Sequence, residues 1–328
     1  MRFGILLPHF GEHANRENVL DGARLAESVG FDSVFTRDHV VYEPHSGIET
    51  ADTTFYDTIT TMAMVAAVTE SITIGTAALI PYRHPIHVAR SLGTITEMAG
   101  ERLLLGLGTG RFDREFDAVG LGGIPRVEML KETIGILRDF SANPLTSHDS
   151  PIYEFTDISV LPTPSKLDIW WCSSVPASAR FAVDMGLGWL PGRITLDTIG
   201  LRRRVMAERS EATGLPMPKI GVVAPTRLAG SRDEAIAGAN VPGLLKWAND
   251  FGKWWVTPAS GGFETAEDLQ GSLIAGSADD VVSEAAAFAD AGVDHLVFDL
   301  RTQFDRWLEL VQLIGEDVLP RARGTTTG

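Results

Sequence analysis

Short apolar segments alternate with longer helical patterns along the whole chain, and this alternation restricts the fold more than any other feature. The apolar segments cover residues 2–7, 33–36, 72–79, 102–107, 168–172, 188–190, 219–224 and 294–300. Their length and composition are typical of buried strands. Strands that alternate with helices form parallel sheets with right-handed crossovers. Eight such units in 328 residues predict an α/β chain with one domain, a (β/α)8 TIM barrel with insertions that spans residues 1–328.

The main alternative is a doubly wound sheet, which carries a glycine-rich nucleotide fingerprint after its first strand. Here the first strand precedes Pro8-His9-Phe10-Gly11, which is not that fingerprint, so the barrel is preferred. Two segments interrupt the alternation. Residues 141–166 contain four prolines and predict a connector or a small hairpin. An insertion at about residues 231–275 is rich in tryptophan and broken by glycine and proline, which predicts a variable substrate lid.

The composition excludes several classes of protein. Lys plus Arg number 28 against 43 for Asp plus Glu, so the net charge is −15. This charge argues against a nucleic-acid partner and against attraction to anionic membranes. No stretch is long and apolar enough to span a membrane, and we expect a cytoplasmic protein. Cys172 is the single cysteine; it excludes a disulfide framework and predicts a buried small side chain. The histidines are too scattered to predict a metal site.

Residues that follow the predicted strands stand where a barrel carries its active site. They are His9, Arg37, Asp38, His39, Ala77, Ala78, Arg83, Thr109, Gly110, Arg111, Ser173, Ser174, Gly192, Arg193 and Arg301. Arginine and histidine are frequent among them although the chain as a whole is acidic. A cationic mouth on an acidic protein indicates an anionic ligand, such as a cofactor that carries a phosphate.

At two of these strand ends, the residues can be interpreted either as chemically active or as purely structural. Histidine exchanges protons near neutral pH, so His39 beside Asp38 is a candidate acid or base; it could equally be a histidine that only hydrogen-bonds within a loop. Ser173 and Ser174 precede Pro176 at the start of a predicted helix, where main-chain amides bind anions. A serine that only caps the helix fits the same pattern. Trp247, in the insertion, could line a substrate pocket or pack between helices.

A series of short motifs, each modest alone, becomes specific in its order along the chain. The motifs are Phe3-Gly4-Ile5 with Pro8, Gly30-Phe31-Asp32-Ser33-Val34-Phe35, Asp38-His39, Ile74-Gly75-Thr76-Ala77, Gly100-Glu101-Arg102-Leu103, Gly106-Leu107-Gly108-Thr109-Gly110, Gly188-Trp189-Leu190-Pro191 and Ala291-Gly292-Val293-Asp294. With this series the chain resembles the luciferase-like flavin-dependent oxidoreductases, the bacterial luciferase-like monooxygenase family. The Asp38-His39 pair is similar to that of the branch that uses the deazaflavin coenzyme F420.

The resemblance implies a cofactor, F420 or alternatively FMN, and roles for individual residues. It implies that His39 exchanges a proton with the substrate and that Asp38 orients it. It implies a bulge, often at a non-prolyl cis bond, between Ala77 and Ala78 behind the flavin ring. Further cofactor contacts would come from Thr109, Gly110, Ser173, Ser174, Gly192 and Arg193. His9, Arg83, Trp247 and Arg301 are candidate substrate contacts. Arg111 and Leu187 depart from the pattern, since several deazaflavin members carry acidic residues there.

Three functions follow from this resemblance. The first is hydride transfer between F420 and a small organic substrate. The second is an FMN-dependent two-component monooxygenase that uses O2 and receives reduced flavin from a separate reductase. The third is a flavin-binding protein that has lost catalysis, against which the retained Asp38-His39 pair argues. The family also implies a homodimer. The sequence does not identify the substrate.

Overall fold

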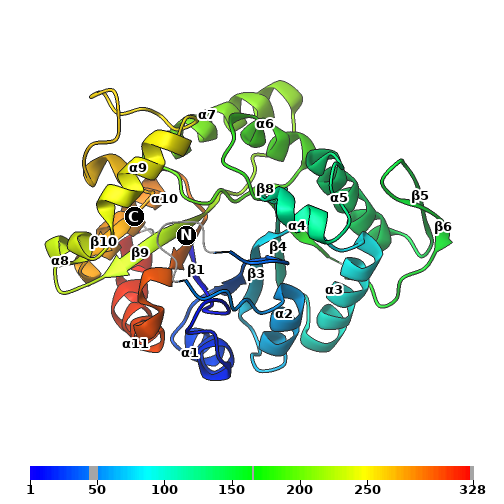
Figure 1. Ribbon diagram of the computed structural model, residues 1–328, viewed down its shortest axis with the longest axis horizontal. Helices are drawn as coiled ribbons and strands as arrows, with labels where there is room; N and C mark the ends of the chain where they lie inside the picture. The colour runs from blue at the N-terminus through cyan, green and yellow to red at the C-terminus, as the bar shows by residue number, and fades with distance from the viewer. Residues whose placement is uncertain (44–50, 165, 326–328) are drawn as a thin grey trace.

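A curled parallel sheet forms the centre of the computed structural model, which describes residues 1–43, 51–164 and 166–325 (Figure 1). Its strand order is β10-β9-β11-β1-β2-β3-β4-β7-β8. The strands are β1 (Arg2–Leu6), β2 (Ser33–Thr36), β3 (Thr73–Leu79), β4 (Leu103–Leu107), β7 (Asp168–Trp171), β8 (Gly188–Trp189), β9 (Gly221–Leu228), β10 (Ile274–Gly276) and β11 (His295–Asp299). All pairs in this sheet are parallel, as the alternation of strands and helices predicts.

The sheet brings the two ends of the chain together, because β1 pairs with β2 on one side and with β11 on the other. At its far edge Trp189 of β8 forms a parallel bridge with Ile220, the residue before β9. The amide of Val223 in β9 also donates to the carbonyl of Pro191 at 3.4 Å. The predicted α/β class and parallel sheet are therefore confirmed in a strongly curled form.

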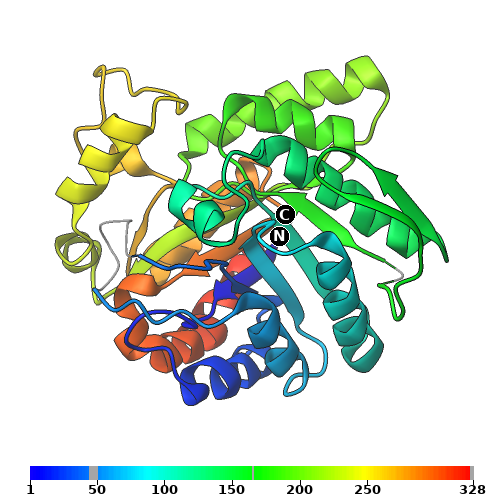
Figure 2. The ribbon, with the colours of Figure 1, turned by 45° about the vertical axis from the view of Figure 1, so that its right-hand side comes forward.

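Helices surround the strands on the outside in Figures 1 and 2. The longer ones are α2 (Thr58–Ala66), α3 (Pro85–Ala99), α5 (Arg126–Ala142), α6 (Pro176–Met185), α7 (Leu196–Thr213), α9 (Val241–Phe251) and α10 (Ala278–Asp290). The short ones are η1 (Glu17–Asp21), α1 (Gly22–Ser28), α4 (Asp113–Ala118), α8 (Arg232–Ala237), η2 (Glu267–Leu269), η3 (Arg301–Arg306), α11 (Trp307–Leu313), η4 (Ile314–Val318) and α12 (Leu319–Thr325). The side chains between helices and sheet form a continuous core.

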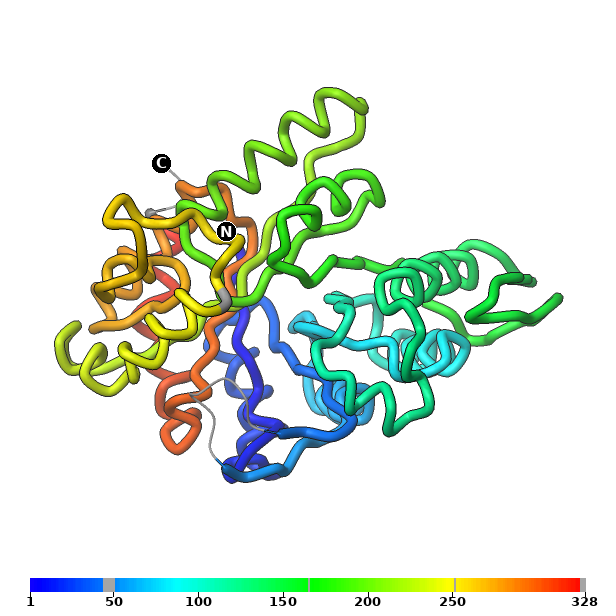
Figure 3. Tube along the Cα trace, turned by 45° about the horizontal axis from the view of Figure 1, so that its top comes forward, coloured from blue at the N-terminus to red at the C-terminus, as the bar shows by residue number. Residues whose placement is uncertain are grey.

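The predicted elements coincide with the structure where local signals are strong. Strand β2 has the predicted bounds. The sequence pattern also predicts helices over residues 85–99 and 196–213, which are the bounds of α3 and α7. Helix α3 begins at Pro85, whose missing N–H suits a first turn, and ends at Gly100, whose φ of 83° suits glycine. Residues 141–166 contain the antiparallel hairpin of β5 (Thr146–Asp149) and β6 (Glu154–Ile158), which confirms the small-hairpin alternative. The hairpin projects from the edge of the molecule in Figure 3.

Three elements differ from the sequence prediction. Strand β10, at the end of the predicted insertion, pairs with the last residues of β9 and makes nine strands where eight were predicted. The pattern of residues 304–319 predicts one final helix, but 3-10 and π-helical turns interrupt the helical segment there. Helix α4 was missed: it has six residues, and its N-cap Phe112 makes no side-chain capping bond. Such a short helix depends on tertiary contacts for its stability, which the sequence pattern does not display.

Among residues 1–43, 51–164 and 166–325, no helix has both the length and the apolar character that crossing a membrane requires. The polar sequence of residues 37–54, with Pro44 and Gly47, predicts a long irregular segment, part of which lies outside the described residues.

Candidate active site

Two adjoining cavities open where the strands end, at the edge where parallel strands of an α/β protein place their ligands. The first has a volume of about 310 Å³ and the second of about 250 Å³. Both are lined by Arg37, Ala77, Ala78, Arg111 and Cys172. The first extends to Ser173, Ser174, Gly192, Arg193 and Arg301, and the second to Asp38, His39, Thr109, Gly110 and Glu115. Nearly all the predicted cofactor and catalytic residues are therefore gathered around one connected space.

The shared floor of the cavities is the end of β3. The peptide bond between Ala77 and Ala78 is cis, and the register between β3 and β4 shifts between Ala77 and Leu79. Both the cis bond and the bulge expected from the resemblance are thus confirmed. Gly108 allows the neighbouring turn to pack closely here, because a β-carbon on it would lie 3.0 Å from Cβ of Ala78. The floor consequently presents main chain and methyl groups rather than large side chains.

One end of the space, here called the turn end, consists of Ser173, Ser174, Gly192 and Arg193. The carbonyl of Ser173 accepts from the indole of Trp189 at 2.8 Å, which anchors the turn to β8. Helix α6 follows at Pro176, and its N-cap Val175 makes no side-chain capping bond. Helix N-termini favour anions. The guanidinium of Arg193 lies 4.2 Å from the ring centre of Trp247 in α9.

The other end, here called the His39 end, is organised around a histidine and a carboxylate. Nδ1 of His39 lies 3.1 Å and 3.2 Å from the two carboxylate oxygens of Glu115. Nε2 of His39 lies 3.4 Å from Nη2 of Arg37. A carboxylate accepts and a guanidinium donates, so this network assigns the proton of a neutral His39 to Nδ1 and leaves Nε2 as an acceptor.

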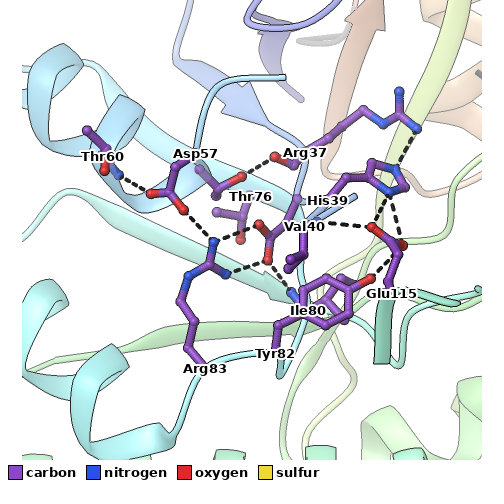
Figure 4. A network of polar contacts seen from close by, with 12 residues as sticks. Arg37, His39, Val40, Asp57, Thr60, Thr76, Ile80, Tyr82, Arg83 and Glu115 are labelled. Carbon is purple, nitrogen blue, oxygen red and sulfur yellow. Dashed lines mark hydrogen bonds and ion pairs between the residues drawn. The ribbon is translucent and has the colours of Figure 1, made fainter. Parts of the chain in front are cut away.

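Glu115 is 1% exposed and is held from several sides (Figure 4). Its carboxylate accepts from the hydroxyl of Tyr82 at 2.7 Å and from the amide of Val40 at 3.0 Å, in addition to His39. Burial raises the pKa of the Glu115 carboxyl, but hydrogen bonds from His39, Tyr82 and main-chain amides outweigh it and lower the pKa overall. The network therefore keeps Glu115 ionised beside the imidazole.

The sequence missed Glu115 because α4, which carries it, was not predicted. Two signals could have indicated it: Glu115 follows the glycine-rich turn after the fourth strand, and it precedes Phe116, which is fully buried.

Asp38 does not orient His39, which corrects the expectation from the resemblance. Its carboxylate accepts from Arg83 at 2.8 and 3.1 Å and from the amide of Ile80 at 3.0 Å. Burial raises the pKa of Asp38, against the opposing effect of Arg83. Arg83 also pairs with Asp57 at 2.5 Å. Arg83 lines neither cavity, and its geometry favours an ion-pair role over the predicted contact with substrate.

His9 is likewise not at the surface of either cavity. It is fully buried, its Nδ1 donates to the carbonyl of Leu7 at 2.9 Å, and its Nε2 accepts from the amide of Arg37 at 3.0 Å. Burial lowers the pKa of His9 to about 4, so the ring is neutral at pH 7. Because both ring nitrogens bind main chain, His9 supports Arg37 and does not contact a ligand as predicted.

The remaining predicted residues lie at the first cavity or next to it. Arg301 lines the first cavity and pairs with Asp299, whose oxygens lie 3.0 and 2.7 Å from its Nε. Trp247 lies behind Arg193 and outside the lining of both cavities, so its predicted substrate contact stays a prediction. Cys172 is half-buried rather than fully buried as predicted, and it lines both cavities. Desolvation raises the pKa of its thiol, which keeps it protonated. Among the residues that the structure describes, no group of three or more His, Cys, Asp or Glu could hold a metal ion.

Comparison with known proteins identifies the family. The family model described as luciferase-like monooxygenase matches residues 1–295 of the sequence. The chain belongs to this family. A relative from Amycolatopsis mediterranei, an F420-dependent glucose-6-phosphate dehydrogenase, is 26% identical over 95% of this chain and 96% of its own. Another with the same name, from Microbacterium testaceum, is 31% identical, but the match covers only 55% of each chain.

Two solved structures share the fold of this luciferase-like chain. An F420-dependent secondary alcohol dehydrogenase in complex with an F420–acetone adduct has a TM-score of 0.79 at 16% identity, over 98% of this chain and 99% of the other. The oxygenating constituent of 3,6-diketocamphane monooxygenase from Pseudomonas putida, in complex with FMN, has a TM-score of 0.75 at 18% identity, over 98% of both chains. At these identities the two structures establish the fold alone.

Proposed function

We propose that this protein is an oxidoreductase that uses coenzyme F420 to transfer a hydride to or from a small organic substrate. The observation that supports it most is the position of His39 in a cavity that shares the bulged Ala77–Ala78 end of β3 with a second cavity, which is lined by Ser173, Ser174 and Arg193. Relatives named for F420-dependent chemistry, among them one aligned over 95% of this chain, support the choice of cofactor.

The residues present fit a deazaflavin that carries a phosphate. The turn end offers the main-chain amides that precede α6 together with Arg193, and a guanidinium is a strong phosphate donor. Ala77 and Ala78 carry only methyl side chains toward the second cavity, and Thr109 and Gly110, which follow β4, line the same cavity. We therefore assign the phosphate to Ser173, Ser174, Gly192 and Arg193, and the ring to Ala77, Ala78, Thr109 and Gly110. When bound, the deazaflavin supplies a carbon centre that accepts or donates a hydride.

His39 handles the proton in this proposal. With its proton on Nδ1, the neutral imidazole keeps its lone pair on Nε2, where a substrate hydroxyl would replace Arg37 as the donor. Glu115 is a positioning residue: it fixes the ring plane and the tautomer through Nδ1 and stabilises the imidazolium that forms after proton uptake. Tyr82 and the amide of Val40 hold Glu115 in turn.

The proposal also covers the overall fold, the insertion, the oligomeric state and the location of the protein. We infer a single (β/α)8 barrel over residues 1–328, supported by the bridge between Trp189 and Ile220. We further infer that the insertion at about residues 231–275 covers the first cavity as a substrate lid, supported by the contact of Trp247 with Arg193. A homodimer and a cytoplasmic location stay predictions from the resemblance and the composition.

The second candidate is an FMN-dependent monooxygenase fed by a separate flavin reductase. The shared fold of an FMN-bound monooxygenase, with a TM-score of 0.75, favours keeping it as the alternative. In that case the same turn end would hold the FMN phosphate.

Cofactor titration separates the two functions. Purified protein is titrated with F420 and, separately, with FMN, and binding is followed by the fluorescence of the cofactor. We expect tight, saturable binding of F420 and weak binding of FMN. Tight binding of FMN without binding of F420 would replace the first function with the second, and binding of neither would remove both.

A further inference from the structure

Two consecutive residues of the turn after β3 hold two consecutive residues of the turn after β2 (Figure 4). Tyr82 donates its hydroxyl to Glu115 at 2.7 Å, and a carboxylate oxygen of Glu115 lies 3.1 Å from Nδ1 of His39. The next residue, Arg83, forms a two-pronged ion pair at 2.8 and 3.1 Å with Asp38, the residue before His39. One contact therefore fixes the imidazole, and the other fixes the chain that carries it.

Asp38 also links the turn after β2 to the end of β3. The parallel register of the two strands runs up to Thr36 opposite Thr76. Further along, the carboxylate of Asp38 accepts from the amide of Ile80 at 3.0 Å. Ile80 follows the bulge of β3, and it lines the second cavity together with Asp38 and His39. One carboxylate thus joins the segment that carries His39 to the floor of the cavity.

Arg83 compensates the charge of this buried carboxylate. Asp38 is 3% exposed, and burial raises the pKa of its carboxyl, an effect that the ion pair with Arg83 opposes. When one partner of a buried ion pair is removed, the other charge is left without compensation, which is strongly destabilising. We therefore expect the link from Asp38 to Ile80 to depend on Arg83.

A second carboxylate fixes Arg83 itself. Nη2 of Arg83 lies 2.5 Å from Oδ2 of Asp57, the N-cap of α2, and Asp57 also accepts from the amide of Thr60 at 2.8 Å. A guanidinium presents five donors in a rigid fork, so one side chain can serve both carboxylates. Arg83 consequently connects the turn after β2, the start of α2 and its own turn after β3.

We propose that Arg83 is a positioning residue of the active site, which acts through Asp38 to fix the main chain of His39 against the end of β3. This inference rests on the proposed F420-dependent function, which assigns the proton to His39 and the deazaflavin ring to the end of β3. Arg83 lines neither cavity, so its effect passes through Asp38 rather than through a ligand. Tyr82 and Arg83 then divide the task, because the first orients the ring of His39 through Glu115 and the second locates its backbone.

The experiment follows histidine ring protons by NMR in the protein labelled with [15N]histidine, without cofactor. The proton on Nδ1 of His39 is identified by its absence in His39→Ala, and its exchange with water is measured. His295 serves as an internal control, because its buried ring lies 2.7 Å from the hydroxyl of Ser33 at the opposite end of β2. Its signal reports on the sheet in the same spectrum.

The variants separate the charge of Arg83 from its shape. Arg83→Gln breaks the ion pair, Arg83→Lys keeps the charge without the fork, and the double variant Asp38→Asn/Arg83→Gln removes both charges. Arg90→Gln, on the exposed side of α3, is the matched control. The affinity of every variant for F420 is measured separately by fluorescence.

In Arg83→Gln, we expect the Nδ1 proton of His39 to exchange with water at least about tenfold faster, while the His295 signal keeps its position. Arg83→Lys should recover part of the protection. The double variant should also recover part of it, because a neutral amide at position 38 still accepts from Ile80 and leaves no buried charge without a partner. The Kd of F420 should stay within about threefold of the parent, since the proposed phosphate contacts lie at the turn end.

Three results would overturn the inference: unchanged exchange at His39 in Arg83→Gln, loss of the His39 and His295 signals together, or no recovery in both Arg83→Lys and the double variant. If Arg83→Gln does not fold, recovery is judged from the other two variants, whose His39 exchange should lie within about tenfold of the parent. A loss of F420 affinity in Arg83→Gln as large as in Arg193→Gln would place Arg83 in cofactor binding instead. If the unmodified protein fails to bind F420 while the His39 exchange behaves as expected, the proposed cofactor is wrong and the contact of Arg83 with Asp38 still positions His39.

Discussion

The two ends of the connected cavities are built in different ways. At the turn end, Ser173 and Ser174 follow β7 directly and precede the first turn of α6, so the anion site comes from one strand–turn–helix unit. At the His39 end, the interacting groups come from separate units: His39 follows β2, Tyr82 follows β3, and Glu115 lies in α4 after β4. The turn end relies on main-chain amides, and the His39 end on side chains that hold one another.

This difference predicts how the two ends respond to substitution. Main-chain donors survive the replacement of any single side chain, so changes at the turn end should weaken cofactor binding moderately. A network of buried side chains fails as a unit, because the loss of one member leaves the others without partners. Changes at the His39 end should therefore affect turnover strongly and cofactor binding little.

The largest effect is expected for His39→Ala. Removal of the proton acceptor should lower kcat by about 10²–10⁴-fold, while the affinity for F420 stays close to that of the parent. Steady-state kinetics and cofactor titration check the two quantities. His87→Ala, a change at an exposed histidine of α3, is the control. Full turnover in His39→Ala would contradict the assigned role.

Glu115→Gln tests whether the network determines the state of His39. A glutamine amide can donate to Nδ1 and so favour the tautomer with its proton on Nε2, which should lower kcat by about 10²-fold. Because a structural defect could also lower activity, the pH profile of kcat is measured as well; it should shift in Glu115→Gln and not in the exposed Glu97→Gln control. Tyr82→Phe, which removes one donor to Glu115, should give a smaller change in the same direction. An unchanged pH profile in Glu115→Gln would rule out the positioning role.

Arg193→Gln examines the turn end. Loss of one charge-assisted hydrogen bond to a phosphate should raise the Kd of F420 about tenfold. The kcat at saturating cofactor should change little, because Arg193 lines the first cavity and His39 the second. Fluorescence titration gives the Kd, and Arg90→Gln on the exposed side of α3 serves as the control. A collapse of kcat at saturating F420 would show that the two ends do not act separately.

The smallest effect is expected for the pH dependence of folding stability, through His9, which binds the main chain of Arg37 at the His39 end. Burial lowers the pKa of His9 to about 4 from 6.5, so the unfolded chain binds the extra proton first as the pH falls. His9 therefore contributes stability that is present above about pH 6.5 and is lost as the pH falls toward 4. Between pH 7 and pH 5.5 the loss attributable to His9 should be about 1 kcal/mol.

Denaturant unfolding at both pH values, with His9→Asn for comparison, measures this contribution. The variant should be less stable at pH 7 and should lose less stability between pH 7 and pH 5.5 than the parent does. An equal loss in the two proteins would assign the pH dependence to other groups, such as the buried His295, whose pKa burial lowers to about 3.

Much of the turn end and of the sheet could be predicted because their signals are local. The turn end depends on residues that are close in sequence: strand β7, then Ser173 and Ser174, then Pro176 in the first turn of α6. The structure places them as the pattern predicts. The cis bond between Ala77 and Ala78 followed from the resemblance. Asp38 and His9 show the limit: both stand after strands as active-site residues do, yet one binds Arg83 and the other binds main chain.

The sequence by itself determined the parallel α/β architecture and the residues that stand at the strand ends, because hydrophobic period and turn residues act over short stretches of chain. The family followed from the resemblance of its ordered motifs. The tertiary structure decided which of these residues meet. Glu115 reaches His39 across 76 positions of sequence, from a six-residue helix whose N-cap makes no side-chain capping bond. The partner of a buried side chain depends on how distant units pack, and a local pattern carries no information about that packing.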